Sequence, residues 1–579
     1  MTVAFVRQIG AEPGVQLNPL RDNSEIPSTD NSDQIFGIVM RATRGRIDKP
    51  FAVDSGNVYT KLGYGEQIRV NALNLAWVHV VEALNNGAYQ AVVQRLSTAE
   101  SKIKWVVVKK SAAESADSAE VGTAHVGSAK VGATPAEEPV ETAGTPVYTF
   151  EVSEEEPEGE FLFAVKHLEC FNDGIKVSFR AEEKREGGKN VANDEITLQI
   201  IDPHEDNVIY TFTGSLDINA KDDYGNSKYL PDIVESQTDA VEVRVGVSGA
   251  AAVVEPDSEA YGYTENGSMA WAESDTLICF EEGATNYETE DYLKARNLLQ
   301  NSEFDYAYIS SGGTKATALL QQLAQLAYET NRQLRFDIPG SLTPEGAIQW
   351  VENLNFGSQK CAHLLHAFWA PLKSDDPTGV NPKGVFGVAT LNIAMACGRN
   401  ATKNAKGFAA KNYPIAGREW PVNRSGISQI YTPSQKEKSQ LATAKINPTI
   451  YEQYTGGGRY TFTDSLTCAM VDQSLRKLIA VADMSTSIDD AVTRAGKDYL
   501  QLPMKVAVKR MQDFLLQHLT NAEASGWLVA SSDPMMEGRS FKYQVQPNAA
   551  KPYDAMDVMY WVRYDGTARQ IFVTQTLTK

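Results

Sequence analysis

Two short segments contain side chains that could do chemistry. Cys361, His363 and His366 lie within six residues of one another, and thiolate and imidazole groups are common ligands of zinc. Residues 310–315, Ser-Ser-Gly-Gly-Thr-Lys, lie between an expected strand and an expected helix, where backbone N–H groups can bind phosphate. The first segment would make a metal centre, and the second would make a phosphate or nucleotide site.

The context of both segments favours a structural interpretation. Residues 361–369 are expected to form a strand, in which side chains three positions apart point to opposite faces, so core or edge histidines are expected. Residues 310–315 do not match G-x-x-x-x-G-K-[ST], and an ordinary strand-to-helix turn also needs glycine. No G-x-S-x-G sequence exists, and no histidine lies where it suggests a base. We expect no catalytic residue, metal or cofactor.

The composition limits the partners. The 579 residues are enough for three or four domains. With 54 Lys plus Arg and 74 Asp plus Glu, the formal charge is −20, which repels nucleic acid and anionic membranes. The five cysteines are far apart and form no CxxC pair, so a reducing compartment fits best. No signal peptide and no membrane span are expected.

The end of the chain, residues 556–577, contains two β-rich runs around Asp565-Gly566, a strong hairpin signal. A two-residue loop predicts three facing pairs: Val558 with Val573, Tyr560 with Ile571, and Met559 with Phe572. Both faces would then be apolar, and a two-stranded hairpin is marginal alone. We expect that the edges of this hairpin are covered by the chain's own core or by another copy of the protein.

The start of the chain offers a second terminal strand. Val3, Phe5 and Ile9 alternate with other side chains, and a long polar tether, residues 18–33, follows. A short strand on a tether suits β-augmentation, in which an extended segment joins the sheet edge of another chain. An ordinary strand in the protein's own sheet is the alternative, and the pattern alone favours it.

The elements between the ends alternate in type. A strand at 34–40, a helix at 71–86 closed by Gly87, and a strand ending at Leu96 form one α/β unit. Residues 111–146 are of low complexity, without an aromatic residue, and predict a surface insertion. Residues 161–247 are rich in strands and predict a β-sandwich.

From residue 288 the pattern becomes strand–helix–strand. Strands are expected at 305–310, 333–338 and 361–369, and a helix from Thr314 carries Leu319, Leu323 and Leu326 on one face. Another helix should begin with Thr343 as its N-cap and Pro344 at its first position. This order is typical of a parallel α/β sheet.

Residues 486–519 are expected to be helical, with one helix beginning near Pro503, which suits a first helical position. Its predicted buried stripe consists of Val508, Met511, Leu515 and Leu519. Lys505 and Lys509 share a face beside Arg510, and a solvated basic face is the favoured interpretation of this group.

Several of these segments resemble one family, the contractile tail sheath proteins of bacteriophages, which are related to R-type pyocin and type VI secretion sheaths. The likeness lies in Pro13-Gly14-Val15, Arg44-Gly45 with Pro50, the segment 88–95 (AYQAVVQR), and above all 213–234 (TGSLDINAKDDYGNSKYLPDIV). Residues 412–417, 446–448 and 456–458 match further family landmarks, although the family's Trp-Gly after the last one is missing.

The resemblance implies an α+β multidomain protein: a β-sandwich insertion, an α/β subtilisin-like middle domain without protease chemistry, and a mixed α/β core domain built from both chain ends. The expected boundaries are 1–33 (linking arm and tether), 34–105 (N-terminal part of the core), 106–160 (acidic low-complexity insertion), 161–270 (β-sandwich), 271–455 (subtilisin-like domain) and 456–579 (C-terminal core with the terminal linking strand).

The resemblance also implies a function. The subunit would polymerise helically in six-fold rings around a tail tube and contract to drive the tube through the host cell envelope. Its partners would be itself, the tail tube protein, and the baseplate and tail terminator proteins. It would be assembled in the host cytoplasm and located in the virion. Alternatives are an enzyme with a Rossmann-like nucleotide-binding middle domain at Gly312-Gly313, or a non-contractile virion structural protein.

By the same resemblance, particular side chains would make the contacts between subunits and with the tube. The linking strands would use Val3, Phe5 and Ile9 at one end and Ile571, Phe572 and Val573 at the other. The tube would be held by a charged helix in the C-terminal domain, for which Lys505, Lys509 and Arg510 are the candidates.

Overall fold

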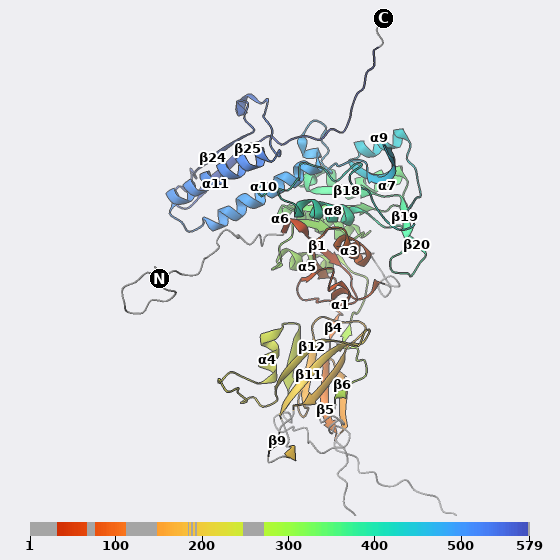
Figure 1. Cartoon of the computed structure of the whole chain (residues 1–579), viewed down its shortest axis with the longest axis vertical. Helices are drawn as coiled ribbons and strands as arrows, with labels where there is room; N and C mark the ends of the chain where they lie inside the picture. The colour runs from red at the N-terminus through yellow and green to blue at the C-terminus, as the bar shows by residue number, and fades with distance from the viewer. Residues whose placement is uncertain are drawn as a thin grey trace, which may run out of the picture.

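The computed structural model describes residues 32–65, 76–111, 147–182, 185–186, 189–190, 194–246 and 271–576. They form a mixed α/β body, a two-sheet domain at the bottom of the view in Figure 1, and a unit of helices and strands at its upper left.

The body is organised around one eight-stranded sheet with the order β2-β3-β1-β16-β17-β18-β22-β23. The six inner strands are parallel, whereas the outermost strands β2 and β23 pair antiparallel with their neighbours. The strands are β1 (Ile35–Met40), β2 (Phe51–Val53), β3 (Gln90–Arg95), β16 (Tyr308–Ser310), β17 (Gln333–Ile338), β18 (Leu365–Trp369), β22 (Ile446–Tyr454) and β23 (Gly457–Phe462). The predicted parallel α/β pattern is thus present.

Helices cover both faces of this sheet because successive side chains of a strand point to opposite sides. On β1, Phe36 and Ile38 enter one core cluster and Val39 enters another. The first cluster includes residues of α3 (Ala76–Asn85) and α8 (Ala389–Ala401). The second includes residues of α5 (Thr289–Gln300), α6 (Thr317–Thr330), α7 (Pro344–Leu354) and α9 (Gln435–Thr443).

Local signals located several helices well. Thr343 is the N-cap of α7, where its hydroxyl accepts a hydrogen bond from the Gly346 N–H at 3.3 Å, and Pro344 is the first helical residue. The predicted stripe of α6 is buried. The strand expected at 361–369 is shorter: a 3₁₀ turn covers Ala362–Leu364, and β18 starts at Leu365.

The N-terminal strands lie in the same sheet as the strands of the expected middle domain. β1 pairs with β16 on one side and β3 on the other, so the strands β1, β2 and β3 belong to the same sheet as β16, β17 and β18. The partner of a buried parallel strand is chosen by packing over long sequence distances, which the local pattern does not encode.

A pair of four-stranded sheets forms the second domain, with strand orders β12-β11-β8-β14 and β13-β7-β5-β6. They share one apolar cluster, in which the rings of Phe163 and Phe179 lie 5.1 Å apart edge to face. The elements are β5 (Trp105–Ser111), β6 (Val147–Ser153), β7 (Phe163–His167), β8 (Lys176–Ala181), β11 (Glu195–Asp202), β12 (Asn207–Ser215), α4 (Leu230–Gln237), β13 (Val241–Val245) and β14 (Ala272–Glu273).

Buried arginines join the two-sheet domain to the body. The Arg44 side chain, fully buried, donates to the carboxylates of Asp173 and Asp202. Arg95 donates to the carbonyl oxygens of Gly45 and Cys170 at 3.0 and 2.6 Å. Because the carboxylate partners of Arg44 and the Cys170 carbonyl lie across the junction, these contacts fix the geometry of the junction.

Shorter elements complete the description. They are η1 (Ser32–Gln34), α1 (Val58–Leu62), β4 (Lys102–Ile103), β9 (Arg185–Glu186), β10 (Lys189–Asn190), β15 (Phe280–Glu281), η3 (Phe356–Ser358), η4 (Ala362–Leu364), β19 (Leu372–Asp375), β20 (Lys383–Gly384), β21 (Ser428–Gln429), η5 (Leu475–Lys477) and η6 (Pro534–Met536).

The C-terminal unit consists of α10 (Ile479–Asp498), α11 (Met504–Ala524) and the antiparallel strands β24 (Phe541–Pro547) and β25 (Met556–Val562). The prediction of a helical stretch at 486–519 holds, but two helices form it, and α11 starts one residue after Pro503. The predicted stripe is buried at Met511, Leu515 and Leu519 and half-buried at Val508.

Candidate interaction surfaces at the chain ends

The predicted C-terminal hairpin is wrong. β25 pairs with β24, with Tyr560 opposite Tyr543 and Val558 opposite Val545, and not with the residues after Gly566. A strand of seven residues with a matching apolar face is available in β24, and this tertiary pairing overrides the local Asp-Gly turn signal.

After β25 the chain leaves the body. Its last backbone hydrogen bonds in the described part run between Arg563 and Val529 (2.9 Å) and from the Asp565 N–H to the Trp527 carbonyl (3.1 Å). We name residues 566–576 the C-terminal arm. The arm belongs to no strand and extends away from the rest of the molecule at the top of Figure 1.

The arm exposes apolar side chains. Ile571, Phe572 and Val573 are 82%, 89% and 87% exposed. Three consecutive β-branched or aromatic residues on an extended segment have the composition of a strand without a sheet. The arm therefore has both the backbone groups and the side chains that a sheet edge would take up.

The sheet of β24 and β25 is itself narrow. Its inner face packs on α10 and α11, with Val545 buried and Val558 and Tyr560 half-buried. On its outer face Met559 and Trp561 are 38% and 41% exposed. Two strands leave unpaired backbone groups along their outer edges, which favours the addition of further strands.

At the other end, Ser32 and Asp33 are the first described residues, and they are held firmly. The Asp33 carboxylate forms ion pairs with Lys411 at 3.4 Å and Lys403 at 3.9 Å, and its carbonyl accepts from the Asn400 side chain at 2.7 Å. The Ser32 hydroxyl accepts from Arg494 at 3.4 Å. Val3, Phe5 and Ile9 lie outside the described residues, so their role as a linking strand stays a prediction.

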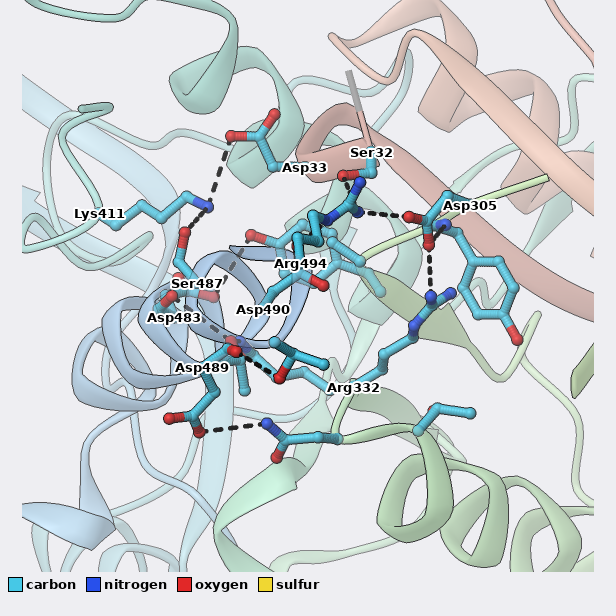
Figure 2. Close-up of a pocket in the computed structure, with 18 of the residues that line it drawn as sticks. Ser32, Asp33, Asp305, Arg332, Lys411, Asp483, Ser487, Asp489, Asp490 and Arg494 are labelled. Carbon is cyan, nitrogen blue, oxygen red and sulfur yellow. Dashed lines mark hydrogen bonds and ion pairs between the residues drawn. The ribbon is translucent and has the colours of Figure 1, made fainter. Parts of the chain in front are cut away.

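Figure 2 shows the cavity, of about 300 Å³, that Ser32 and Asp33 line together with α10 and the ends of β16 and β17. Asp305 forms ion pairs with both Arg332 and Arg494 across it. Lys411 is buried and donates to the Ser487 hydroxyl at 3.0 Å; burial lowers its pKa, against the charges of Asp33 and Asp483. These pairings make the cavity a polar joint between the body, α10 and the root of the N-terminal segment.

Asp483 on α10 is a fully buried group of this joint. Its carboxylate accepts from Arg399 at 2.9 Å and from Arg335 at 3.2 Å, and all three side chains are buried. Burial alone would raise the pKa of Asp483, but the charges of Arg399 and Arg335 lower it to about 2. A charged carboxylate thus binds α10 to β17 and α8.

The structure shows where the predicted basic residues of α11 lie, but it contains no tube for them to contact. Lys505, Lys509 and Arg510 are all exposed on the first turns of α11. The Lys509 ammonium pairs with Asp513 at 2.6 Å, and both side chains are largely exposed. Contact of these three residues with a tube therefore stays a prediction.

The two segments that could do chemistry, residues 310–315 and residues 361–366, contain side chains and glycines that are closely packed against neighbouring elements. A Cβ at Gly312 would lie 2.8 Å from the Ala76 Cβ, and one at Gly313 would lie 2.4 Å from the His79 Nε2. The side chains of Ala76 and His79 on α3 thus pack directly against the two glycines. Burial lowers the pKa of His366 to about 3, and no cluster of metal-ligating side chains occurs in the described part of the chain.

The cysteines and the apolar content of the helices were also considered in the sequence. All five cysteines are free and buried. Among the described residues, no helix combines the length and apolar character needed to cross a bilayer.

The chain was also compared with known proteins. No protein-family model matches it, and no curated protein matches it. Among solved structures it is similar to a chain of the anti-feeding prophage (AFP) baseplate, with 15% identity, a TM-score of 0.38, and coverage of 52% of this chain and 77% of that one.

The chain is also similar to two sheath structures, with the same TM-score as for the baseplate chain. One is the sheath complex of the extracellular contractile injection system PVC in its contracted state, with 13% identity, a TM-score of 0.38, and coverage of 48% and 74%. The other is the AFP helical sheath in its contracted state, with 12% identity, a TM-score of 0.38, and coverage of 52% and 77%. All three of these chains come from contractile injection systems.

Proposed function

We propose that this chain is the structural subunit of a contractile tail sheath. The observation that carries the proposal is the C-terminal arm: an extended, unpaired segment with three exposed apolar residues, next to a sheet of only two strands. An arm of this kind suits a subunit that completes the sheet of a neighbour. The sheath-like motifs at 13–15, 44–50, 88–95 and 213–234 support the assignment to this class of polymer.

In the proposed assembly, arms from both chain ends join sheets of adjacent copies in a helical lattice of stacked six-fold rings around a tail tube. The subunits are first assembled in an extended lattice and then shift to a contracted one of lower free energy. The arms keep neighbours connected while the rigid bodies rotate. Baseplate and tail terminator proteins would bind the two ends, and the particle would be a phage-type virion assembled in the host cytoplasm.

The domain assignments of this proposal follow the same resemblance. The α/β body between residues 271 and 455 corresponds to the subtilisin-like domain, and the two-sheet domain corresponds to the β-sandwich on the outside of the lattice. In this proposal the subunit is not an enzyme; at the Gly312-Gly313 turn, where the alternative places a nucleotide, Ala76 and His79 of α3 pack against the glycines.

Electron microscopy of the purified protein tests the proposal. The wild type should form tubes or helical assemblies, and the triple variant Ile571→Asp, Phe572→Asp, Val573→Asp should remain as discrete particles, because charges on the arm prevent its burial in a sheet. The matched control is Tyr553→Asp, at an aromatic side chain 93% exposed in the loop between β24 and β25. Tubes formed equally by the triple variant would contradict the proposal.

A further inference from the structure

The C-terminal arm is held at one point. The Arg569 guanidinium donates two hydrogen bonds to the Asp464 carboxylate, from Nε to Oδ1 at 2.8 Å and from Nη2 to Oδ2 at 2.5 Å. Asp464 lies just after β23, the edge strand of the central sheet, and its side chain is only 14% exposed. Among the described residues after Arg569, none forms a hydrogen bond or ion pair with the rest of the chain.

The pair has the properties of a specific contact. A bidentate arginine–carboxylate pair fixes the guanidinium in orientation as well as in position. Asp464 is itself oriented, because its Oδ1 also accepts the Ser465 N–H at 2.8 Å. The Arg569 side chain is 27% exposed, so water reaches the pair and it can open without unfolding the body.

We propose that the Arg569–Asp464 pair is a latch that sets the direction of the C-terminal arm and presents Ile571, Phe572 and Val573 to a second copy of this chain. This inference rests on the proposed function. In the closed latch, the apolar triplet starts two residues after a fixed point. In the open latch, the nearest fixed point is Asp565, six residues before the triplet.

The change in tether length gives the size of the effect. Measured to Val573, the free segment grows from four residues to eight when the latch opens. Once two copies are joined by another contact, the effective concentration of the tethered triplet at the neighbour's sheet falls roughly as the −3/2 power of tether length, so doubling the length lowers it about threefold. The closed latch therefore favours capture of the arm by pre-ordering it before contact.

Two variants test the latch on the full-length chain. Arg569→Ala removes the donor and keeps the arm, whereas the exchange Asp464→Arg with Arg569→Asp restores an opposite pair. Dyes are placed at Thr574→Cys on the arm and at Tyr413→Cys on the body, where Tyr413 is 65% exposed, and the five native cysteines are buried. Single-molecule energy transfer at high dilution then measures the arm in the isolated subunit.

We expect a narrow distance distribution in the wild type, a broad one in Arg569→Ala, and a narrow one again in the exchange variant. The critical concentration for tube assembly should rise about threefold or more in Arg569→Ala and return towards the wild-type value in the exchange variant. An equally narrow distribution in Arg569→Ala, or an unchanged critical concentration, would overturn the latch.

A deletion of residues 570–579 separates this inference from the proposed function. That variant keeps Arg569 and Asp464 but lacks the apolar triplet. Assembly of the deleted chain into normal tubes would contradict the proposed role of the arm, whereas broadening of the arm distances in Arg569→Ala would still report the latch in the isolated subunit.

Discussion

The two sheets that lie nearest the end of the chain differ in how completely they are covered. The eight-stranded sheet has helices on both faces and a buried apolar cluster on each side. The β24–β25 sheet has two strands, is covered on one face, and exposes Met559 and Trp561 on the other. The large sheet is thus covered within the chain, whereas the small sheet keeps one open face and two strand edges, which is the geometry to which a further strand can add.

The charged side chains of the two regions also differ in how deeply they are buried. Under the large sheet, buried charges are paired within the chain, as at Asp483 with Arg335 and Arg399. At the small sheet and the arm, the paired charges are partly exposed, as at Arg569 and Asp464. Breaking contacts in the first region should therefore cost folding stability, and in the second region it should cost association.

The largest expected effect is that of Asp483→Ala. It leaves two buried arginines without their carboxylate, so the free energy of unfolding should fall by about 3–5 kcal/mol. Chemical denaturation measures it. The control is Asp490→Ala on the same helix, where a 52% exposed side chain pairs with Arg494 and about 0.2–1 kcal/mol is expected. Equal losses in both variants would show that burial of the triad does not matter.

Asp337, a second buried carboxylate under the large sheet, should make the stability of the protein fall as the pH rises. Burial raises the pKa of Asp337 from 3.8 to about 6, against the N–H groups of Ala389 and Val388, which donate to its Oδ1 at 2.8 and 2.6 Å. Between about pH 4 and 6 the unfolded chain releases this proton and the folded chain keeps it. The contribution of Asp337 to stability is thus full below pH 4 and is lost as the pH rises through 6.

The variant Asp337→Asn keeps an oxygen acceptor and removes the titration. Relative to wild type, it should gain about 3 kcal/mol of stability between pH 4 and pH 7, from about two pKa units at 1.4 kcal/mol each. Denaturation curves of both proteins at the two pH values give this double difference. A difference between the proteins that is the same at both pH values would contradict the assignment.

Substitutions on the open face of the β24–β25 sheet should affect assembly more than folding stability. The double variant Met559→Lys, Trp561→Lys places charges on the open face of β25, and we expect about a tenfold higher critical concentration, which is about 1.4 kcal/mol. Stability should change by no more than about 0.5 kcal/mol, because both side chains are already partly exposed. Ile218→Lys with Tyr224→Lys, 69% and 91% exposed in the two-sheet domain, is the matched control. A loss of stability without a loss of assembly would remove the distinction between the two sheets.

The contrast also explains what the sequence could predict. The cap at Thr343-Pro344 and the stripe of α6 depend on residues three or four apart, and both were located. The pairing of β1 with β16 and of β25 with β24 depends on packing between distant segments, so the first was not foreseen and the second was replaced by a false hairpin. The alternation of Phe541, Tyr543 and Val545 was the signal that could have revealed β24.

Of the features of the C-terminal arm, the sequence revealed the apolar residues but not the Arg569–Asp464 pair. The resemblance to sheath proteins singled out Ile571, Phe572 and Val573, and the structure shows that these side chains are exposed, while their role between subunits stays a prediction. The latch was invisible, because Asp464 and Arg569 are 105 residues apart and neither has an unusual neighbour. Packing alone brings such pairs together.

The smallest expected effect concerns α11, which carries the small sheet on one side and exposes Lys505, Lys509 and Arg510. If this helix faces a tube, changing all three residues to Glu should weaken binding of subunits to preassembled tubes several-fold at low salt. Exposed charge pairs contribute only about 0.2–1 kcal/mol each, and salt near 0.1 M screens charges beyond about 10 Å. The difference from wild type should therefore shrink as salt is added.

The control for this variant must change the net charge equally. Lys294→Glu, Lys315→Glu and Lys436→Glu alter three exposed lysines of the body and give the same charge change. Co-sedimentation with tubes at low and high salt compares the two triple variants. Weaker binding only in the α11 variant would place the tube on the side of the small sheet, which would then contact both the tube and the neighbouring subunits. Equal weakening in both variants would mean that net charge acts at long range, and the tube contact would have to lie on another surface.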